Sequence, residues 1–264
     1  MRTPKITLRE VAAHLGVSIS TVSRSLAGHP SISEETRDGV QATAIALGYR
    51  IPINGRRPRK SSTKLIGVVV GALHNSFMTV LLTHLHDALQ EHGYHITLVI
   101  DSMTDSENLF AFRPLIDGFL DGLIFATATL DSPIVKEMQR RGIPIVLVVR
   151  SVDNVSVDLV EVDNVQAGMV AAAHLYQLGH KRIGLVMGPE NTSTSRDRAR
   201  GALQWLAQQG IEPESIALVF GDYTTDSGYS SAIAMLGTHN PVTSIIAGND
   251  TIALGVLDAA KRRG

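Results

Sequence analysis

The feature that most constrains this chain is a pair of helical sequence patterns joined by a glycine within residues 7–26. Apolar residues recur at i, i+3, i+4 and i+7 in the first pattern, which predicts a helix with one apolar face. That face comprises Leu8, Val11, Ala12 and Leu15. Thr7 and Glu10 have the spacing of a capping box, which predicts where this helix begins. Gly16 is suited to the left-handed conformation that ends a helix, so a turn is expected there.

A second helix is expected directly after this turn. The hydroxyl of Ser18 is placed to cap it, and Val22 and Leu26 would face inward because they lie four residues apart. A third helix over residues 33–47, ended by Gly48, would close a small core. Two short helices joined by a tight turn and backed by a third are typical of helix-turn-helix domains that bind DNA, although a helical hairpin without any ligand has the same pattern.

The distribution of charge separates these two interpretations. Residues 1–64 contain 11 Lys or Arg against 4 Asp or Glu, whereas the remaining 200 residues contain 13 against 21. The whole-chain charge of −1 therefore hides a basic arm on an acidic body. Neutralising DNA phosphates requires such a basic arm, so the sequence favours a DNA-binding domain.

Short motifs along the whole chain resemble those of one family of bacterial transcription regulators. In the basic arm they are VSxxTVSR at residues 17–24, ISEETR at 32–37 and LGYR at 47–50. In the body they are IGVVV at residues 66–70, LGHKRI at 178–183 and AGNDxxALG at 247–255. In type and order these motifs are similar to those of the LacI/GalR family. The resemblance implies a helix-turn-helix head and a periplasmic-binding-protein-like body that binds a small-molecule effector.

From residue 65 onward the pattern changes to short apolar runs that alternate with helical segments. This alternation predicts an α/β body of parallel sheets covered on both faces, and its length favours two subdomains with a cleft between them. We expect an all-α head at residues 1–50, a linker at 51–64 and a body at 65–264, with subdomains at about 65–160 and 161–264. The predicted strands are residues 65–71, 95–100, 122–126, 143–149, 182–187, 216–220 and 244–247.

The linker at residues 51–64 contains Arg, Lys, Pro and Ser but no acidic residue, which is typical of a solvated basic tether. The resemblance implies instead a hinge helix that forms on DNA and places a leucine in the minor groove. Pro58 occupies the position of that leucine, and a proline inside a helix costs about 3 kcal/mol, so a regular hinge helix is not expected. We expect the linker arginines to enter a narrow minor groove in an extended conformation, and these are Arg56, Arg57 and Arg59.

The chain ends at Gly264, whereas members of the resembled family continue through further strands that complete the second subdomain. We therefore expect this subdomain to be incomplete, in a fragment, a prematurely stopped chain or a naturally shortened variant. Apolar sheet edges would then be exposed.

Composition and motif content exclude several classes of protein. The chain has no cysteine, which excludes disulfides, thiolate metal sites and a cysteine nucleophile. We expect no metal site, because His84 and His86 fall on different helix faces and no HExxH motif occurs. No signal-peptide core is present and no apolar run approaches the roughly 18 residues of a membrane span. We therefore expect a cytoplasmic protein that contacts no membrane and needs no cofactor.

The second helix of the head carries the residues expected to contact DNA. The first residues of such a recognition helix meet base edges in the major groove. Base contacts are expected from Ile19, Ser20 and Arg24, and phosphate contacts that set the register from Ser18, Thr21 and Ser23. Because one small head supplies little affinity, we expect a homodimer on a palindromic operator in double-stranded DNA.

Effector contacts are expected beyond the carboxyl ends of the strands. Short polar groups, an arginine and aromatic rings there suit a sugar or a related metabolite. The residues expected to bind it, with support from the resemblance, are Phe77, Thr194, Arg198, Tyr223 and Asn249. Where the family often has an acid after the strand at residues 143–149, this chain has Val149 and Arg150, which points to a different and acidic effector.

Two other classes of function compete with a regulator. A sugar-modifying enzyme would use carboxylates such as Asp101, Asp163 or Asp250, but no catalytic motif accompanies them, so we expect no enzyme activity and no catalytic residue. A free solute-binding protein conflicts with the basic head. We therefore predict a transcriptional regulator, a repressor, whose effector acts by preferring one closure of the body. Relief of repression by the effector and repression that requires it both remain open.

Overall fold

The computed structural model describes residues 6–26, 29, 31–47, 62–71, 76–101, 120–212 and 215–263. The chain divides into two compact units, Met1–Ser62 and Thr63–Gly264. The predictions for Gly48 and for the linker arginines Arg56, Arg57 and Arg59 lie outside the described residues.

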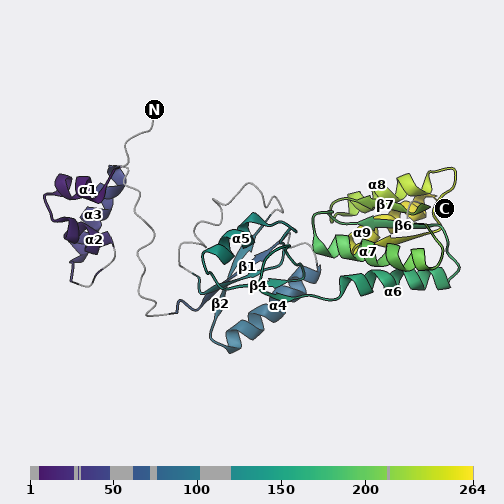
Figure 1. The fold of residues 1–264 in the computed structure, drawn as a ribbon, viewed down its shortest axis with the longest axis horizontal. Helices are drawn as coiled ribbons and strands as arrows, with labels where there is room; N and C mark the ends of the chain where they lie inside the picture. The colour runs from purple at the N-terminus through teal and green to yellow at the C-terminus, as the bar shows by residue number, and fades with distance from the viewer. Residues whose placement is uncertain are drawn as a thin grey trace. The chain divides into compact units, whose positions relative to one another are not determined.

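The first unit contains three helices, α1 (Leu8–Leu15), α2 (Ile19–Leu26) and α3 (Glu34–Ala46) (Figure 1). Their ends follow the predicted local chemistry. The Glu10 carboxylate accepts hydrogen bonds from the Thr7 amide at 2.6 Å and the Thr7 hydroxyl at 2.8 Å, so α1 begins with a capping interaction. Gly16 ends α1 at a φ of 65°, in the left-handed region. The Ser18 hydroxyl caps α2 by accepting the Thr21 amide at 3.0 Å.

A small apolar core holds the three helices together. It consists of Val11, Ala12, Val22, Val40 and Ala44, all of them buried. Leu8, Leu15 and Leu26 pack against this core while remaining partly exposed. The predicted inward face of each of the first two helices is therefore confirmed, and the opposite face of α2 is left in solvent.

The capping interaction at Glu10 should make the start of α1 sensitive to acid. The hydrogen bonds from the Thr7 backbone and side chain hold the pKa of Glu10 below its ordinary value of 4.5. A lowered pKa in the folded state means that the stabilisation is present above pH 4.5 and is lost as the pH falls through the lowered pKa. We expect NMR titration of the Glu10 carboxyl to give that lowered value. Glu10→Gln, which retains an acceptor, should keep α1 protected from hydrogen exchange at acid pH, and equal acid sensitivity of both proteins would contradict the assignment.

The first half of the body is a parallel sheet with strand order β2-β1-β3-β4-β5. Helix α5 covers one face, where Phe125, Ile134 and Met138 are buried together, and α4 covers the other through Met78. Strands buried on both faces need continuous apolar runs, which is why the sequence predicted them. The elements are β1 (Leu65–Val70), α4 (Ser76–Glu91), β2 (His95–Ile100), β3 (Gly122–Phe125), α5 (Pro133–Arg140), β4 (Ile145–Val148) and β5 (Asp158–Val160).

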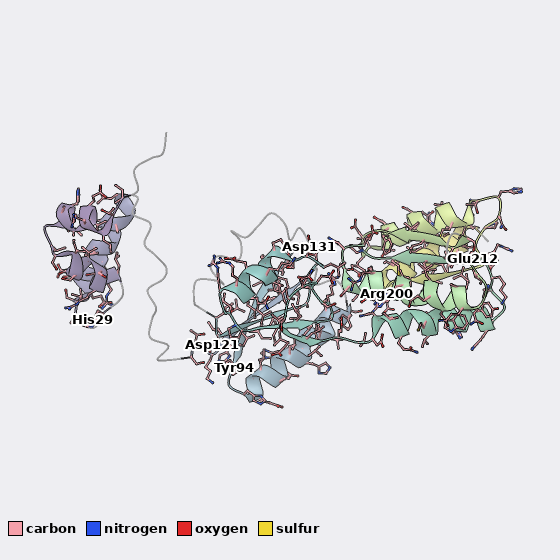
Figure 2. All side chains as sticks on the ribbon, viewed as in Figure 1. His29, Tyr94, Asp121, Asp131, Arg200 and Glu212 are labelled. Carbon is pink, nitrogen blue, oxygen red and sulfur yellow. The ribbon has the colours of Figure 1, made fainter. Side chains whose placement is uncertain are left out.

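The beginning of the body is fixed to the amino end of this sheet. The Asp121 carboxylate accepts hydrogen bonds from the backbone amides of Thr63 and Lys64, both at 3.0 Å. The Lys64 ammonium lies 4.4 Å from the ring centre of Tyr94 (Figure 2). These contacts hold the residues that enter β1.

The second half of the body is a parallel sheet with strand order β7-β6-β8. Helices α6 and α7 run side by side along one face, where Leu185 and Leu206 are buried, and α8 and α9 cover the other face through Met235 and Ile252 (Figure 1). The elements are α6 (Asn164–Gln177), β6 (Ile183–Met187), α7 (Ser193–Gln208), β7 (Ala217–Phe220), α8 (Thr225–Leu236), β8 (Ser244–Ala247) and α9 (Asp250–Arg263).

The predicted fold class, a helix-turn-helix head followed by an α/β body with parallel sheets, is confirmed. Each predicted strand lies within two residues of an observed one. The sequence did not reveal β5, because it has only three residues and all of them are exposed. None of the helices in the described ranges combines the length and apolarity needed to cross a bilayer.

Candidate functional site

The exposed face of α2 carries most of the residues predicted to contact DNA. Val22 and Ser25 are buried against the head, which fixes the rotation of the helix. Ser20, Ser23 and Arg24 are exposed, and Ile19 is 44% exposed although it is apolar. An exposed isoleucine at the start of the helix suits contact with a thymine methyl group, and an exposed arginine in its last turn suits contact with a base edge.

The predicted phosphate contacts have mixed surroundings. The Ser18 hydroxyl lies 2.7 Å from the Ser20 hydroxyl and 2.8 Å from the Thr21 hydroxyl. Ser18 thus serves as a helix cap, and its neighbours form a small hydroxyl cluster at the start of α2. Ser18 and Ser23 are exposed, whereas Thr21 is half-buried.

In the body, polar side chains gather at the carboxyl ends of the strands of both sheets. Asp101 follows β2, Thr127 follows β3 and Arg150 follows β4, and all three are buried. The Arg150 guanidinium donates to the Thr127 carbonyl oxygen at 3.2 Å, and the Thr127 hydroxyl donates to the Asp101 carboxylate at 3.2 Å. This site lies where ligands of open parallel sheets bind.

A tight turn directs Arg150 into this site. The Arg150 amide donates to the Val148 carbonyl at 2.8 Å, so the turn spans three residues with Val149 at its centre. Val149 has a φ of 72°, which is a strained conformation for a β-branched residue. Strain of this kind is concentrated at functional sites, where the surrounding structure maintains it.

The second sheet contributes a run of buried hydroxyl groups and an aromatic ring. The Tyr223 hydroxyl lies 3.2 Å from Thr192 Oγ1, 2.9 Å from Thr194 Oγ1 and 2.8 Å from Ser195 Oγ. Its ring centre lies 5.2 Å from the Arg150 guanidinium carbon. A Cβ on Gly188 would come within 2.2 Å of the same ring, so glycine is required there.

These contacts change the protonation equilibria of the two central groups. Burial is the largest influence on Arg150 and lowers its pKa, and the nearby charge of Arg198 lowers it further, against the opposing effects of Tyr223 and Asp101. Burial acts to raise the pKa of Tyr223, but the Arg150 charge and the hydroxyl hydrogen bonds outweigh it, so the pKa is lowered. Burial therefore acts on both groups, and each one's interaction with the other opposes it.

Arg198 connects two other strand ends. Its Nε donates to the Asn164 side-chain oxygen at 3.0 Å, and another guanidinium nitrogen donates to the Gly248 carbonyl at 2.6 Å. Asn249 follows directly, and its side-chain oxygen accepts the Ile252 amide at 2.8 Å, which caps α9. Asn249 is therefore the N-cap of α9, and its side-chain oxygen is already engaged in this hydrogen bond.

The carboxyl ends of the two sheets meet through direct contacts. The Ser151 amide donates to the Ser193 hydroxyl at 2.9 Å, and the Leu130 amide donates to the Asn191 carbonyl at 2.8 Å. Arg196 forms an ion pair with Asp153 at 3.2 Å. Loops that follow β3 and β4 therefore touch the start of α7.

Among the residues predicted to bind an effector, the structure joins Thr194 and Tyr223 by a hydrogen bond, and the charge of Arg198 acts on the neighbouring Arg150. Phe77, at the start of α4, is 53% exposed. The prediction did not include Asn164 or the hydroxyls of Thr192 and Ser195. Four consecutive hydroxyl residues at 192–195, shortly after a buried strand, were the available signal.

A separate hollow lies at the opposite end of the first sheet. It has a volume of about 690 Å³ and lies at the amino ends of β1, β3 and β4, where Tyr94 and Asp121 contribute to its wall. Within the described ranges, no group of three or more His, Asp or Glu side chains is arranged to hold a metal ion.

Removing the phenolic hydroxyl of Tyr223 should destabilise the body. In Tyr223→Phe the buried Ser195 hydroxyl loses this partner, and a buried unsatisfied hydroxyl costs about 1–3 kcal/mol, so we expect the free energy of unfolding to fall by about that amount. Urea denaturation measures the change. The matched control is Tyr229→Phe on α8, where we expect a change within about 0.5 kcal/mol. Equal losses in the two variants would contradict the role of the hydroxyl network.

A helix-turn-helix domain, followed by a body whose two parallel sheets bring polar strand ends together, defines a class of protein. It is the class of transcription regulators that bind DNA and respond to a small molecule. Residues 7–51 match the family described as "Bacterial regulatory proteins, lacI family". Residues 63–264 match "Periplasmic binding proteins and sugar binding domain of LacI family". The chain belongs to the LacI family and is a DNA-binding transcriptional regulator.

Individual relatives agree with this assignment. The chain is 30% identical over 259 residues to the HTH-type transcriptional repressor CytR of Escherichia coli strain K12, covering 98% of this chain and 76% of the relative. It is 29% identical over 260 residues to catabolite control protein A of Priestia megaterium, covering 98% and 78%. Among solved structures, a complex of the transcriptional regulator CelR with cellobiose has a TM-score of 0.68 at 26% identity, covering 98% of this chain and 79% of that one.

Proposed function

We propose that this regulator represses transcription by binding a palindromic operator as a homodimer, and that a sugar or related metabolite bound in the body controls its affinity for DNA. The observation that carries the proposal is the polar site at which the carboxyl ends of both sheets meet, because a ligand bound there contacts loops of both halves. A ligand that prefers one arrangement of these loops shifts the population of DNA-binding states. The cellobiose bound by one relative supports a sugar as effector.

On the DNA side, we propose that α2 enters the major groove. Arg24 would donate to guanine, with Ile19 and Ser20 contacting neighbouring bases, while Ser18, Thr21 and Ser23 hold phosphates. The proposal extends to the linker arginines in the minor groove, which are Arg56, Arg57 and Arg59. We place the protein in the cytoplasm, since that is where a bacterial regulator meets the chromosome.

On the effector side, we propose that Arg150 joins the predicted contacts Phe77, Thr194, Arg198, Tyr223 and Asn249. We also propose the division into a head at 1–50, a linker at 51–64 and a body at 65–264 with subdomains 65–160 and 161–264.

An enzymatic role is not proposed. Two of the carboxylates that it would use already have structural partners, because Asp163 caps α6 by accepting the Gln166 amide and Asp101 accepts the Thr127 hydroxyl.

Exposed apolar residues on the body support dimerisation. Leu254 and Leu257, three residues apart on α9, are 62% and 56% exposed. Apolar residues that gather on one helix in this way are typical of surfaces that pair with another copy. We expect sedimentation equilibrium to give a dimer at the concentrations at which operator binding saturates. A monomer that still binds a two-fold symmetric site would contradict this part of the proposal.

A selection experiment tests the function as a whole. The full chain is incubated with a library of random duplexes, and bound sequences are recovered with and without a mixture of cellular metabolites. We expect enrichment of a two-fold symmetric site and a change in its recovery when metabolites are present. Equal recovery of all sequences at every ionic strength would overturn the proposed function.

A further inference from the structure

The loop that follows α2 holds an exposed histidine, His29, in a fixed position (Figure 2). The His29 amide donates to the Arg24 carbonyl at 2.9 Å, and this bond spans six residues, as in the Schellman motif that closes helices. The His29 carbonyl accepts the Ile32 amide at 3.1 Å, and Arg37 on α3 donates to the Ile32 carbonyl at 3.3 Å. The backbone of His29 is therefore held from both α2 and α3.

Among the residues that the structure describes, the His29 imidazole uses only one of its two nitrogens. The Ser31 amide donates to Nδ1 at 3.3 Å, and the Ser31 hydroxyl lies 2.8 Å from the same nitrogen. A ring nitrogen that accepts a hydrogen bond carries no hydrogen in the neutral imidazole, so Nε2 carries it and can donate. In the charged imidazole Nδ1 can donate to the Ser31 hydroxyl instead. Nε2 is thus a donor in both charge states.

The length of α2 relates this donor to the width of the major groove. The helix has eight residues and is therefore about 12 Å long, which is about the width of the groove. Ser18 and Thr21 lie at the start of α2, and His29 follows its other end. We propose that His29 donates from Nε2 to a DNA phosphate, across the groove from the phosphates held by Ser18 and Thr21, and takes up a proton from solvent as it does so. This inference rests on the proposed placement of α2 in the major groove.

The charged groups around the loop leave the imidazole available to a phosphate. The loop joins α2 to α3, whose charged side chains are Arg24, Glu34, Glu35, Arg37 and Asp38. Within the described ranges none of them forms an ion pair with His29. A nearby phosphate favours the charged form of an imidazole, because it is an opposite charge that also accepts a hydrogen bond. Histidine changes its charge between pH 5 and 8, so the proposed contact makes DNA affinity depend on pH in that range.

Two substitutions separate a phosphate contact from a purely structural role of His29 in the loop. Nδ1 accepts the amide two residues ahead, as an asparagine oxygen does in an Asx-turn, so His29→Asn keeps this bond and removes the Nε2 donor. His29→Arg carries a positive charge at both pH values of the test. The matched control is His239→Asn, which changes an exposed histidine of the body that follows α8.

The test measures the affinity of the full chain for its selected operator at pH 6 and pH 8 over a range of salt concentrations, by fluorescence anisotropy of the DNA. We expect the wild type to bind about fivefold more tightly at pH 6 for each head, because charge-assisted hydrogen bonds are about twice as strong as neutral ones. His29→Asn should lose this difference, and His29→Arg should bind at pH 8 as the wild type does at pH 6. His239→Asn should behave as the wild type. At pH 6 the slope of log affinity against log salt should be shallower in His29→Asn by about 0.9 for each head.

Random duplex DNA separates a phosphate contact from a base contact. At pH 6, His29→Asn should weaken binding to selected and random DNA by the same factor, since phosphates carry no sequence information. A wild-type pH dependence that persists in His29→Asn, or a loss of affinity confined to the selected operator, overturns the inference. Either result leaves the proposed function standing, because that function fails on a different result, a wild-type chain that selects no sequence.

Discussion

Gly201→Ala is expected to lower the free energy of unfolding of the body by about 3 kcal/mol, the upper end of the range of about 1–3 kcal/mol that overpacking typically costs, because the contact is between backbones. A Cβ at Gly201 would lie 2.0 Å from the Val165 carbonyl oxygen, and one at Gly168 would lie 2.0 Å from the Arg198 carbonyl oxygen. Helices α6 and α7 thus cross backbone to backbone, with a glycine on each. A methyl group can fit only if the helices separate.

The single tryptophan of the chain reports on this contact. Trp205 on α7 packs edge to face on Tyr176 of α6, with ring centres 5.4 Å apart, so its fluorescence follows the separation of the two helices. Urea denaturation monitored by this signal gives the free energy. Gln204→Ala is the matched control, since it introduces the same residue at an exposed position of α7 and should change stability by less than about 0.5 kcal/mol. A Gly201→Ala protein as stable as this control would contradict the close crossing.

The helix crossing also matters for the site. Asn164 lies at the start of α6 and Arg198 on α7, and the hydrogen bond between their side chains spans the two helices at 3.0 Å. Separation of α6 and α7 by even a fraction of an ångström would break or lengthen it. We therefore expect that Gly201→Ala, where it folds, also weakens effector binding.

The sequence predicted the strands well for a physical reason. Strands such as β1 and β6 are buried on both faces, so each requires an uninterrupted apolar run that is visible in the sequence. The edge strand β5 has no such requirement, since its three residues are exposed. The glycines at 168 and 201 gave no signal either. A glycine within a helical sequence pattern does not indicate which other helix will pack against it.

The candidate site was less predictable because it joins residues from separate strands. Thr194 and Tyr223 could be placed at strand ends, but their hydrogen bond depends on how α7 begins beside β7. The position of Arg150 depends on the positive φ of Val149, which a valine does not suggest. In the head, by contrast, neighbouring residues in the sequence determine the exposed face of α2, so its surface could be derived from the helical period alone.

Arg24→Ala is expected to reduce affinity for the selected operator by about 10–100-fold for each half-site, because a bidentate arginine–guanine contact contributes about 1–3 kcal/mol of discrimination. Arg24 is exposed on α2, which is held in place by the buried Val22. Affinity for random duplex DNA should fall far less, since one phosphate-attracting charge among many is lost. Electrophoretic mobility shifts at two salt concentrations, on the selected site and on random DNA, measure both quantities.

Arg9→Ala supplies the matched control, since Arg9 is also exposed and carries the same charge but lies on α1. Its loss should weaken selected and random DNA alike, because a charge on the first helix attracts phosphates without reading bases. Substituting single base pairs of the selected site then identifies the guanine. Arg24→Ala should lose discrimination between base pairs at that one position and keep it at all the others. If Arg24→Ala and Arg9→Ala reduced affinity for both DNAs by the same factor, α2 would contribute charge rather than base recognition, and the reading face of the head would have to lie elsewhere.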